Sequence, residues 1–324
     1  MRPTWPLLAL TLLQGLSAGM LCLAAVALLA PAMDIPRSTL FVWQGAAWVA
    51  GALGGMASFF HMHRLAAARY VLRRLGSSWL SREALSTAVY MIVVSFVLLV
   101  HLFWPQDLGV WDAVSGLAAV LGLAAVYITA MLYATIPAMR SWHSPLTVLV
   151  FVCAGLLSGG AADYAMAAGR SSDLALRGAV MGLAAVFGIL LSFQARLFRQ
   201  AAGGVLSATG TGLSGRPYRL QDSGTSRRPY RTQTQIWPEL PARLRRWLYV
   251  LVFALAVAIP WAAAIWLPGL AGGIVLLASV GLGVGLSRWL FFGDATHSSR
   301  VWFADQPKTP SPVRREGKRA YKMQ

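Results

Sequence analysis

Charged residues are scarce in this sequence. Only 12% of its 324 residues are charged, and 11 acidic residues stand against 28 basic ones. Soluble domains carry about 25% charged residues. Together with 57% hydrophobic residues and a mean hydropathy of +0.60, this scarcity excludes an ordinary soluble domain and indicates a polytopic membrane protein.

Cysteine is nearly absent too. Cys22 and Cys153 both lie inside apolar segments, with no CxxC pair and no Cys/His spacing typical of metal ligands. We therefore predict neither a disulfide framework nor a metal site, and we interpret both cysteines as packing residues.

The centres of the apolar segments have almost no ionisable side chains. Pumps and ion-coupled transporters usually need such groups near the middle of the membrane, so this absence counts against transport. A b-type haem needs two axial ligands at matched depth on facing helices. No histidine lies deep, so we expect no haem, although His61 with His143 keeps that alternative open.

What the sequence does have is a series of apolar segments near the roughly 20 residues that cross the hydrocarbon core. Pro268-Gly269 interrupts a run too long for one crossing and predicts a tight hairpin. The sequence thus predicts an all-α integral membrane protein, a bundle of eight transmembrane helices. The segments are 5–29, 39–60, 84–104, 110–135, 145–168, 174–193, 247–267 and 269–292. Glycines expected to let these helices approach closely are Gly51, Gly54, Gly55, Gly281, Gly283 and Gly285.

Basic residues divide unequally between the two faces of such a bundle. With eight spans both termini share one face, which collects 25 Lys and Arg, whereas the other has Arg37, Arg170 and Arg177. Because basic loops stay in the cytoplasm, we predict that both termini are cytoplasmic and that the membrane is the inner (cytoplasmic) one. The net charge is +17, and the charged residues lie between or beyond apolar runs. We therefore expect this positive charge to interact with the lipid bilayer and not with nucleic acid.

Two stretches differ in composition from the bundle. Residues 199–246 and the tail 299–324 are basic and rich in small and polar residues. Such sequences cannot bury a core, so we predict that both are flexible or ordered only against a partner. Residues 1–298 then form the membrane domain, with 199–246 as a basic loop within it.

The stretch from Met56 to Tyr90 holds the strongest candidates for chemistry. It places His61 and Glu83 at the two ends of a basic connection between apolar segments. A histidine beside a carboxylate can accept a hydroxyl proton and pass it to water. This suits a quinol, whose ring gives up protons and electrons while its tail stays in lipid. The predicted topology brings further groups to the same edge: Tyr133, His143, Arg288 and His297. Anchoring in the headgroup region is the simpler interpretation of the same residues.

Three separated motifs resemble the membrane-anchor (DmsC-like) proteins of dimethyl sulfoxide reductase-type molybdoenzymes. The first follows the pattern L-x-R-x-G-x-S-x-L-S-x-E from Leu72 to Glu83, with His61 in the position of the family's histidine. The others are MLYATIPAMRSWHSPLT at 131–147 and SRWLFFGDATH at 287–297. WLSRE and WHSPLT are most similar to the branch with anchors of cytoplasmic sulfite dehydrogenases. The chain departs from the family directly after His61, where Met62-His63-Arg64-Leu65 replaces an L-G-x-P turn, and in the basic loop.

The resemblance implies a protein without a redox centre of its own, which works as one part of a larger complex. In such complexes the molybdenum cofactor lies in a catalytic subunit and iron–sulfur clusters lie in a ferredoxin-like subunit. The anchor holds both at the membrane and binds menaquinone or ubiquinone. The resemblance also implies that His61 and Glu83 bind and oxidise quinol, and Arg74 is a further candidate. The chain is then a quinol-reacting or non-catalytic member of an oxidoreductase complex.

Several alternatives remain open at this point. The complex acts on dimethyl sulfoxide, sulfite or another substrate, and an anchor of a sulfite:quinone oxidoreductase is one version of the same function. A purely structural anchor is another. From a different class, a transporter of unknown substrate fits the composition.

The predicted topology can be tested with reporter fusions. Alkaline phosphatase fused after Gln324 should be inactive, because its disulfides do not form in the cytoplasm. A matched fusion after Ser171, in a predicted outer connection, should be active. The measurement is phosphatase activity in whole cells. If only the Gln324 fusion is active, the orientation is the opposite of the one predicted.

Overall fold

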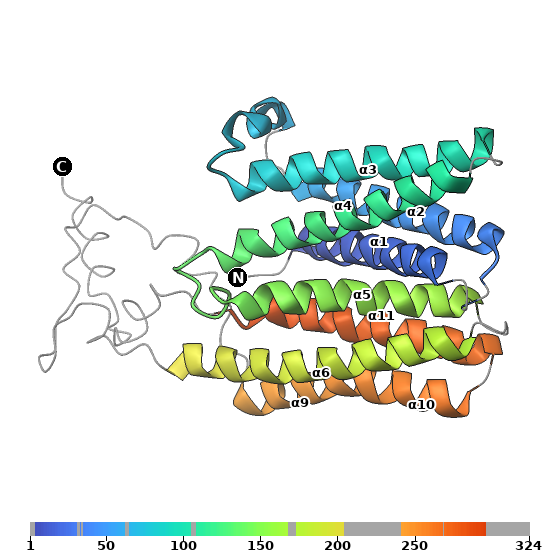
Figure 1. The fold of residues 1–324 in the computed structure, drawn as a ribbon. Helices are drawn as coiled ribbons and strands as arrows, with labels where there is room; N and C mark the ends of the chain where they lie inside the picture. Colours follow the sequence, from blue (N-terminus) through green and yellow to red (C-terminus); the bar gives the residue numbers. More distant parts are fainter. Residues whose placement is uncertain are drawn as a thin grey trace, which may run out of the picture.

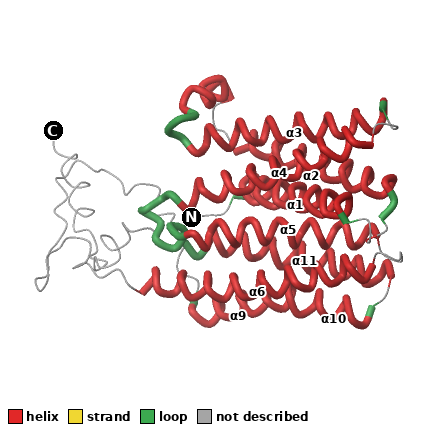
Figure 2. Tube along the Cα trace, viewed as in Figure 1, coloured by secondary structure: helices red, strands yellow, loops and turns green. Residues whose placement is uncertain are grey.

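The computed structural model describes residues 4–30, 33, 35–61, 65–104, 108–167, 173–203, 241–267 and 269–295. Across these residues Figure 2 shows helices and loops and no strand. The described part has 8 helical stretches long and apolar enough to cross a membrane, which confirms the predicted spans and the all-α class. They are α1 (Trp5–Leu29), α2 (Arg37–His61), α3 (Trp79–Phe103), α4 (Leu108–Ala134), α5 (Pro145–Ala167), α6 (Asp173–Gly203), the unit from α9 (Ala242–Phe253) through η3 (Ala254–Ala258) to α10 (Ile259–Trp266), and α11 (Gly269–Gly293).

Three helices extend beyond their predicted ends. The start of α3 is Trp79 rather than Ala84, α6 continues past Phe193 to Gly203, and α9 starts at Ala242. Apolar runs mark only the part of a helix inside lipid, whereas polar residues with good helix propensity carry it further. The first and last residues of the predicted flexible loop 199–246 are therefore helical, in α6 and α9. Residues 204–240 of this loop lie outside the described residues.

The seventh span contains a break in its regular hydrogen bonding. Ala254–Ala258 forms a short π-helical segment between α9 and α10, just before Pro260. Proline has no N–H to donate to the preceding turn, and a π segment is one way in which a helix accommodates the missing bond. After Trp266 the span ends, and Gly269, with φ of 68°, opens α11, which confirms the predicted hairpin.

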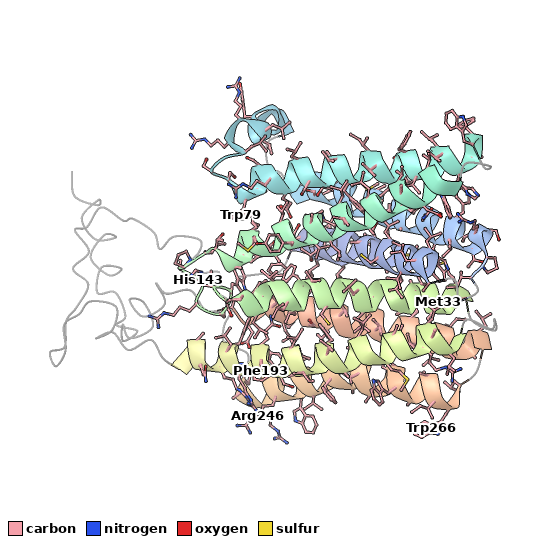
Figure 3. The ribbon with its side chains drawn as sticks, viewed as in Figure 1. Met33, Trp79, His143, Phe193, Arg246 and Trp266 are labelled. Atoms are coloured by element: carbon pink, nitrogen blue, oxygen red, sulfur yellow. The ribbon has the colours of Figure 1, made fainter. Side chains whose placement is uncertain are left out.

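The helices lie side by side with α1 in the middle of the bundle (Figure 1). α1 contacts α2, α4, α5 and α11, while α3 packs on α4 at one side and α6 packs on α5 towards the other. In Figure 3, Trp79, His143 and Arg246 lie at one end of the bundle and Met33 and Trp266 at the opposite end. We call these the His143 end and the Met33 end.

The backbones of α1 and α5 approach closely where these two helices cross. Gly15 and Gly19 of α1 face Gly155 and Gly159 of α5, two G-x-x-x-G motifs. A Cβ on Gly155 would be 3.2 Å from the Cα of Gly15, and one on Gly159 would overlap the backbone of Gly19 and Met20. In lipid, such small residues let backbones touch and gain packing energy.

The glycines singled out from the sequence give a mixed result. Close packing is confirmed at Gly51, where a Cβ would be 2.7 Å from Met91, and at Gly283, where it would be 2.7 Å from the backbone nitrogen of Ala256. Gly54 is also tight, 3.2 Å from Leu13. The prediction is wrong for Gly55 and Gly281, which face open space, and it missed the four glycines of the α1–α5 crossing.

Adding one methyl group tests the crossing. Gly159→Ala should lower the free energy of unfolding by about 2 kcal/mol or more, because the atoms in its way are backbone and cannot rotate aside. Gly281→Ala is the matched control, since nothing lies within 4 Å of a Cβ there. Thermal unfolding in detergent measures both, and equal stability of the two variants would contradict the crossing.

Candidate functional site

The turn before α3 fixes where this helix begins. η2 (Leu65–Arg74) ends at the His143 end, and Ser78 caps α3 by accepting a bond from the Ser81 N–H at 3.4 Å. The Arg82 guanidinium donates back to the carbonyls of Leu75 at 2.8 Å and Gly76 at 2.7 Å. These contacts satisfy the free backbone groups at the turn.

Glu83 consequently lies inside α3 and not at the lip of a loop, which corrects the predicted position. The polar connection ends at Ser78, and Glu83 follows one turn into the helix with a side chain only 8% exposed. The sequence pattern placed the helix start at Ala84 because the first turn, Trp79–Arg82, contains polar residues.

A chain of polar side chains surrounds Glu83. The Thr129 hydroxyl of α4 lies 2.8 Å from Glu83 Oε1 and 3.3 Å from Gln14 Oε1 of α1. The Gln14 amide nitrogen in turn donates to Thr87 Oγ1 at 3.1 Å. A hydroxyl has one proton to donate, so Thr129 serves either Glu83 or Gln14 at a time unless Glu83 itself is protonated and donates to Thr129.

Tyr133 and Arg288 lie next to this polar chain. Tyr133 of α4 is buried one turn after Thr129, and its ring lies 5.7 Å from that of Phe151 by centroid. Arg288 of α11 is 2% exposed; its guanidinium stacks 3.4 Å from the Phe151 ring centroid and donates to the Phe151 carbonyl at 3.2 Å. Within the part of the chain that the structure describes, its Nε and Nη1 have no hydrogen-bond partner. A buried guanidinium with unused donors can hold an oxygen atom of a bound molecule.

Aromatic rings enclose Tyr133 and Arg288 at this end. The rings of four residues lie 5.3 to 5.7 Å from that of Tyr133 by centroid. They are Trp142, Phe151, Phe291 and Phe292. The Trp142 indole N–H donates to the Phe291 carbonyl at 2.8 Å, which ties the loop before α5 to α11. Two of the motifs quoted from the sequence therefore meet here.

The other predicted site residues lie at the end of α2, at the end of η2 or outside the described residues. His61 is the last residue of α2, but its side chain lies outside the described part of the structure. Arg74 closes η2 with an exposed side chain, and it forms no ion pair with any acidic side chain in the described ranges. His63 and His297 lie outside the described residues. The structure thus shows surroundings for Glu83, and among the described side chains it shows no ion pair between Glu83 and Arg74.

His143 is separated from Glu83 by α4. It is exposed, with Nδ1 2.8 Å from the Ala134 carbonyl, and it borders a groove of about 340 Å³ between α4 and the start of α5. Tyr127 and Met131 line that groove, whereas Thr129 turns the opposite face of α4 towards Glu83. The predicted cluster therefore splits into an interior group and an outer groove.

Gln14, Thr87 and Thr129 were missed by the sequence analysis. Each is a lone polar residue in an apolar span, and such residues usually bond across helices. Helical spacing could have found two of them, because Thr87 follows Glu83 by one turn and Thr129 precedes Tyr133 by one turn.

The arrangement can bind and exchange a proton. Glu83 offers a carboxylate near the end of the bundle, Thr129 supplies a donor to it, and Arg288 offers further donors beside Phe151. Among the described residues, no group of three His, Cys, Asp or Glu side chains is placed to hold a metal ion.

Known proteins are similar to this chain in sequence. Residues 1–214 match the family described as DMSO reductase anchor subunit (DmsC). Over 94% of this chain and 99% of the relative, the sequence is 29% identical to a sulfite dehydrogenase subunit of Allochromatium vinosum. The family covers more than half of the chain, including the turn before α3, Glu83 and Thr129. The protein therefore belongs to the DMSO reductase anchor subunit family, the membrane anchors of molybdoenzymes.

Proposed function

We propose that this anchor exchanges electrons with the quinone pool through a site at Glu83, and that it holds an iron–sulfur subunit and a molybdopterin catalytic subunit at the cytoplasmic membrane. The observation that carries the proposal is the buried carboxylate of Glu83, bonded by Thr129 one turn inside the His143 end. A buried acid in a membrane span is costly and marks a functional site by default.

The residues present fit a quinone headgroup. A quinone needs donors for its carbonyl oxygens, and a quinol needs acceptors for its hydroxyls. The Arg288 Nε and Nη1 are buried donors without partners in the described ranges, and Glu83 is an acceptor. When bound, the quinone supplies the redox chemistry that this chain's residues do not.

In this proposal Glu83 and His61 handle the proton. Oε1 of Glu83 accepts the Thr129 hydroxyl, which leaves Oε2 for a quinol hydroxyl. Because His61 ends α2 at the same end of the bundle as the start of α3, it can take the proton from Glu83 and pass it to water. Arg74, exposed at the end of η2, then lies near the place where the proton passes to water.

Electrons pass directly between the quinone and a cluster of the partner. The chain's own cysteines, Cys22 and Cys153, are separate and lie in α1 and α5. We place the partner at the His143 end, which we also assign to the cytoplasm because basic residues gather there. Complementary charge between the basic residues at the His143 end and an acidic surface of the partner would guide the docking of the partner.

Purification of the tagged chain in mild detergent tests the anchor function. Molybdenum and iron should accompany it in the eluate, because the partner proteins carry both elements. The relative's name contains sulfite, so sulfite is the first substrate to assay in the complex. A metal-free protein that alone carries a solute flux in liposomes would support a transporter instead.

Removal of the proton-handling groups tests the quinone site. His61→Ala and Glu83→Ala should each lower quinol-coupled turnover at least about a hundredfold, the usual contribution of acid–base groups. Assembly and the partner's dye-coupled activity should not change.

Ser86→Ala is a suitable control on the same helix, since its hydroxyl donates only to the backbone carbonyl of Glu83 at 3.0 Å. It should retain quinol-coupled turnover. Full turnover in both the His61 and the Glu83 variant would leave a purely structural anchor.

A further inference from the structure

A second groove lies between α6 and α9, on the side of the bundle away from α3 (Figure 1). Its volume is about 340 Å³. Leu191, Val250 and Phe253 form its apolar part, and Arg196 and Arg199 stand along its rim with Tyr249 opposite. None of the residues that carry the proposed quinone chemistry takes part in it.

The two arginines of this groove have no acidic side chain among the described residues to neutralise them. They lie one helical turn apart on α6, so both side chains reach the same side. Asp294, which contacts the groove residue Tyr249 at 3.5 Å, is paired with Arg245 at 3.1 Å. Among the described carboxylates, none pairs with Arg196 or Arg199.

The apolar part of the groove continues onto a surface that faces lipid. Val250 is 55% exposed, Phe253 46% and the neighbouring Phe193 54%. All three belong to the candidate membrane spans Leu174–Ala201 and Ala242–Trp266. Figure 3 places Phe193 and Arg246 near the His143 end, so the arginine rim lies where the spans leave the membrane.

We infer that this groove binds one anionic phospholipid, with its phosphate against Arg196 and Arg199 and an acyl chain along Val250 and Phe253. Guanidinium groups form paired bonds to phosphate oxygens, and basic pockets between membrane helices are suited to charged headgroups. An acidic soluble protein could reach the arginines, but it could not cover apolar side chains inside the bilayer. The combination therefore favours a lipid.

Titration with phosphatidylglycerol tests this site. The full chain is purified in a neutral detergent, and native mass spectrometry counts the lipids that remain bound at each concentration. The double variant Arg196→Gln/Arg199→Gln should bind phosphatidylglycerol about thirtyfold more weakly than the unchanged protein, which corresponds to about 2 kcal/mol for two basic side chains at the membrane surface.

The matched control is Arg73→Gln/Arg140→Gln. It removes the same charge from two exposed residues on η2 and on the loop before α5, neither of which lines the groove. The control should bind phosphatidylglycerol like the unchanged protein. Phosphatidylcholine should bind weakly to all three, and inorganic phosphate should not displace phosphatidylglycerol.

Equal affinity of the two double variants would overturn the proposal, as would tight binding of phosphatidylcholine. Displacement by inorganic phosphate would mean a general anion site. If the groove variant loses its iron–sulfur partner while it keeps the lipid, the arginines are a protein contact instead. None of these outcomes depends on whether Glu83 serves a quinone.

Discussion

The close backbone contact between α1 and α5 lies at the centre of the bundle. Gly15, Gly19, Gly155 and Gly159 bring the two helices together without side chains between them. Lipid offers helices little hydrophobic reason to associate, so such close packing supplies much of the attraction. α1 also contacts α2, α4 and α11, and its own polar groups next to these glycines bond to α3. α1 therefore joins the α1–α5 crossing to the polar chain around Glu83, through the bonds of Gln14 to Thr87 and Thr129.

The fold could be predicted because lipid imposes a simple length rule. Each span needs an apolar run, and the breaks at Pro268 and Gly269 are visible in the sequence. The ends of the helices could not be predicted. Helices such as α6 continue beyond their apolar run, and polar residues such as Arg196 and Arg199 do not mark where the helix stops. The sequence also could not predict which glycines pack against another helix. Gly281 and Gly283 look alike in sequence, but only a Cβ on Gly283 would contact a neighbouring residue.

The candidate site was predictable by residue type but not by arrangement. The motif from Leu72 to Glu83 contains the acid on which the proposal rests. The hydroxyl that bonds it belongs to Thr129 of α4, and Gln14 of α1 bonds that hydroxyl in turn, both far away in the sequence. Which face of α4 each residue occupies depends on its helical register. Register places Tyr133 on the inner face of α4, whereas His143 lies in the loop before α5 beside the outer groove, although the sequence placed both at one edge.

Arg288 also has a consequence for the biogenesis of the protein. α11 follows the other described spans in the sequence, and Arg288 lies in its last turns. A buried charge in an apolar span is costly unless other helices supply partners for it. The ring and carbonyl that receive this guanidinium belong to Phe151 of α5, synthesised much earlier. The burial of Arg288 therefore depends on α5, and we expect α11 to insert stably only when α5 is present to supply these contacts.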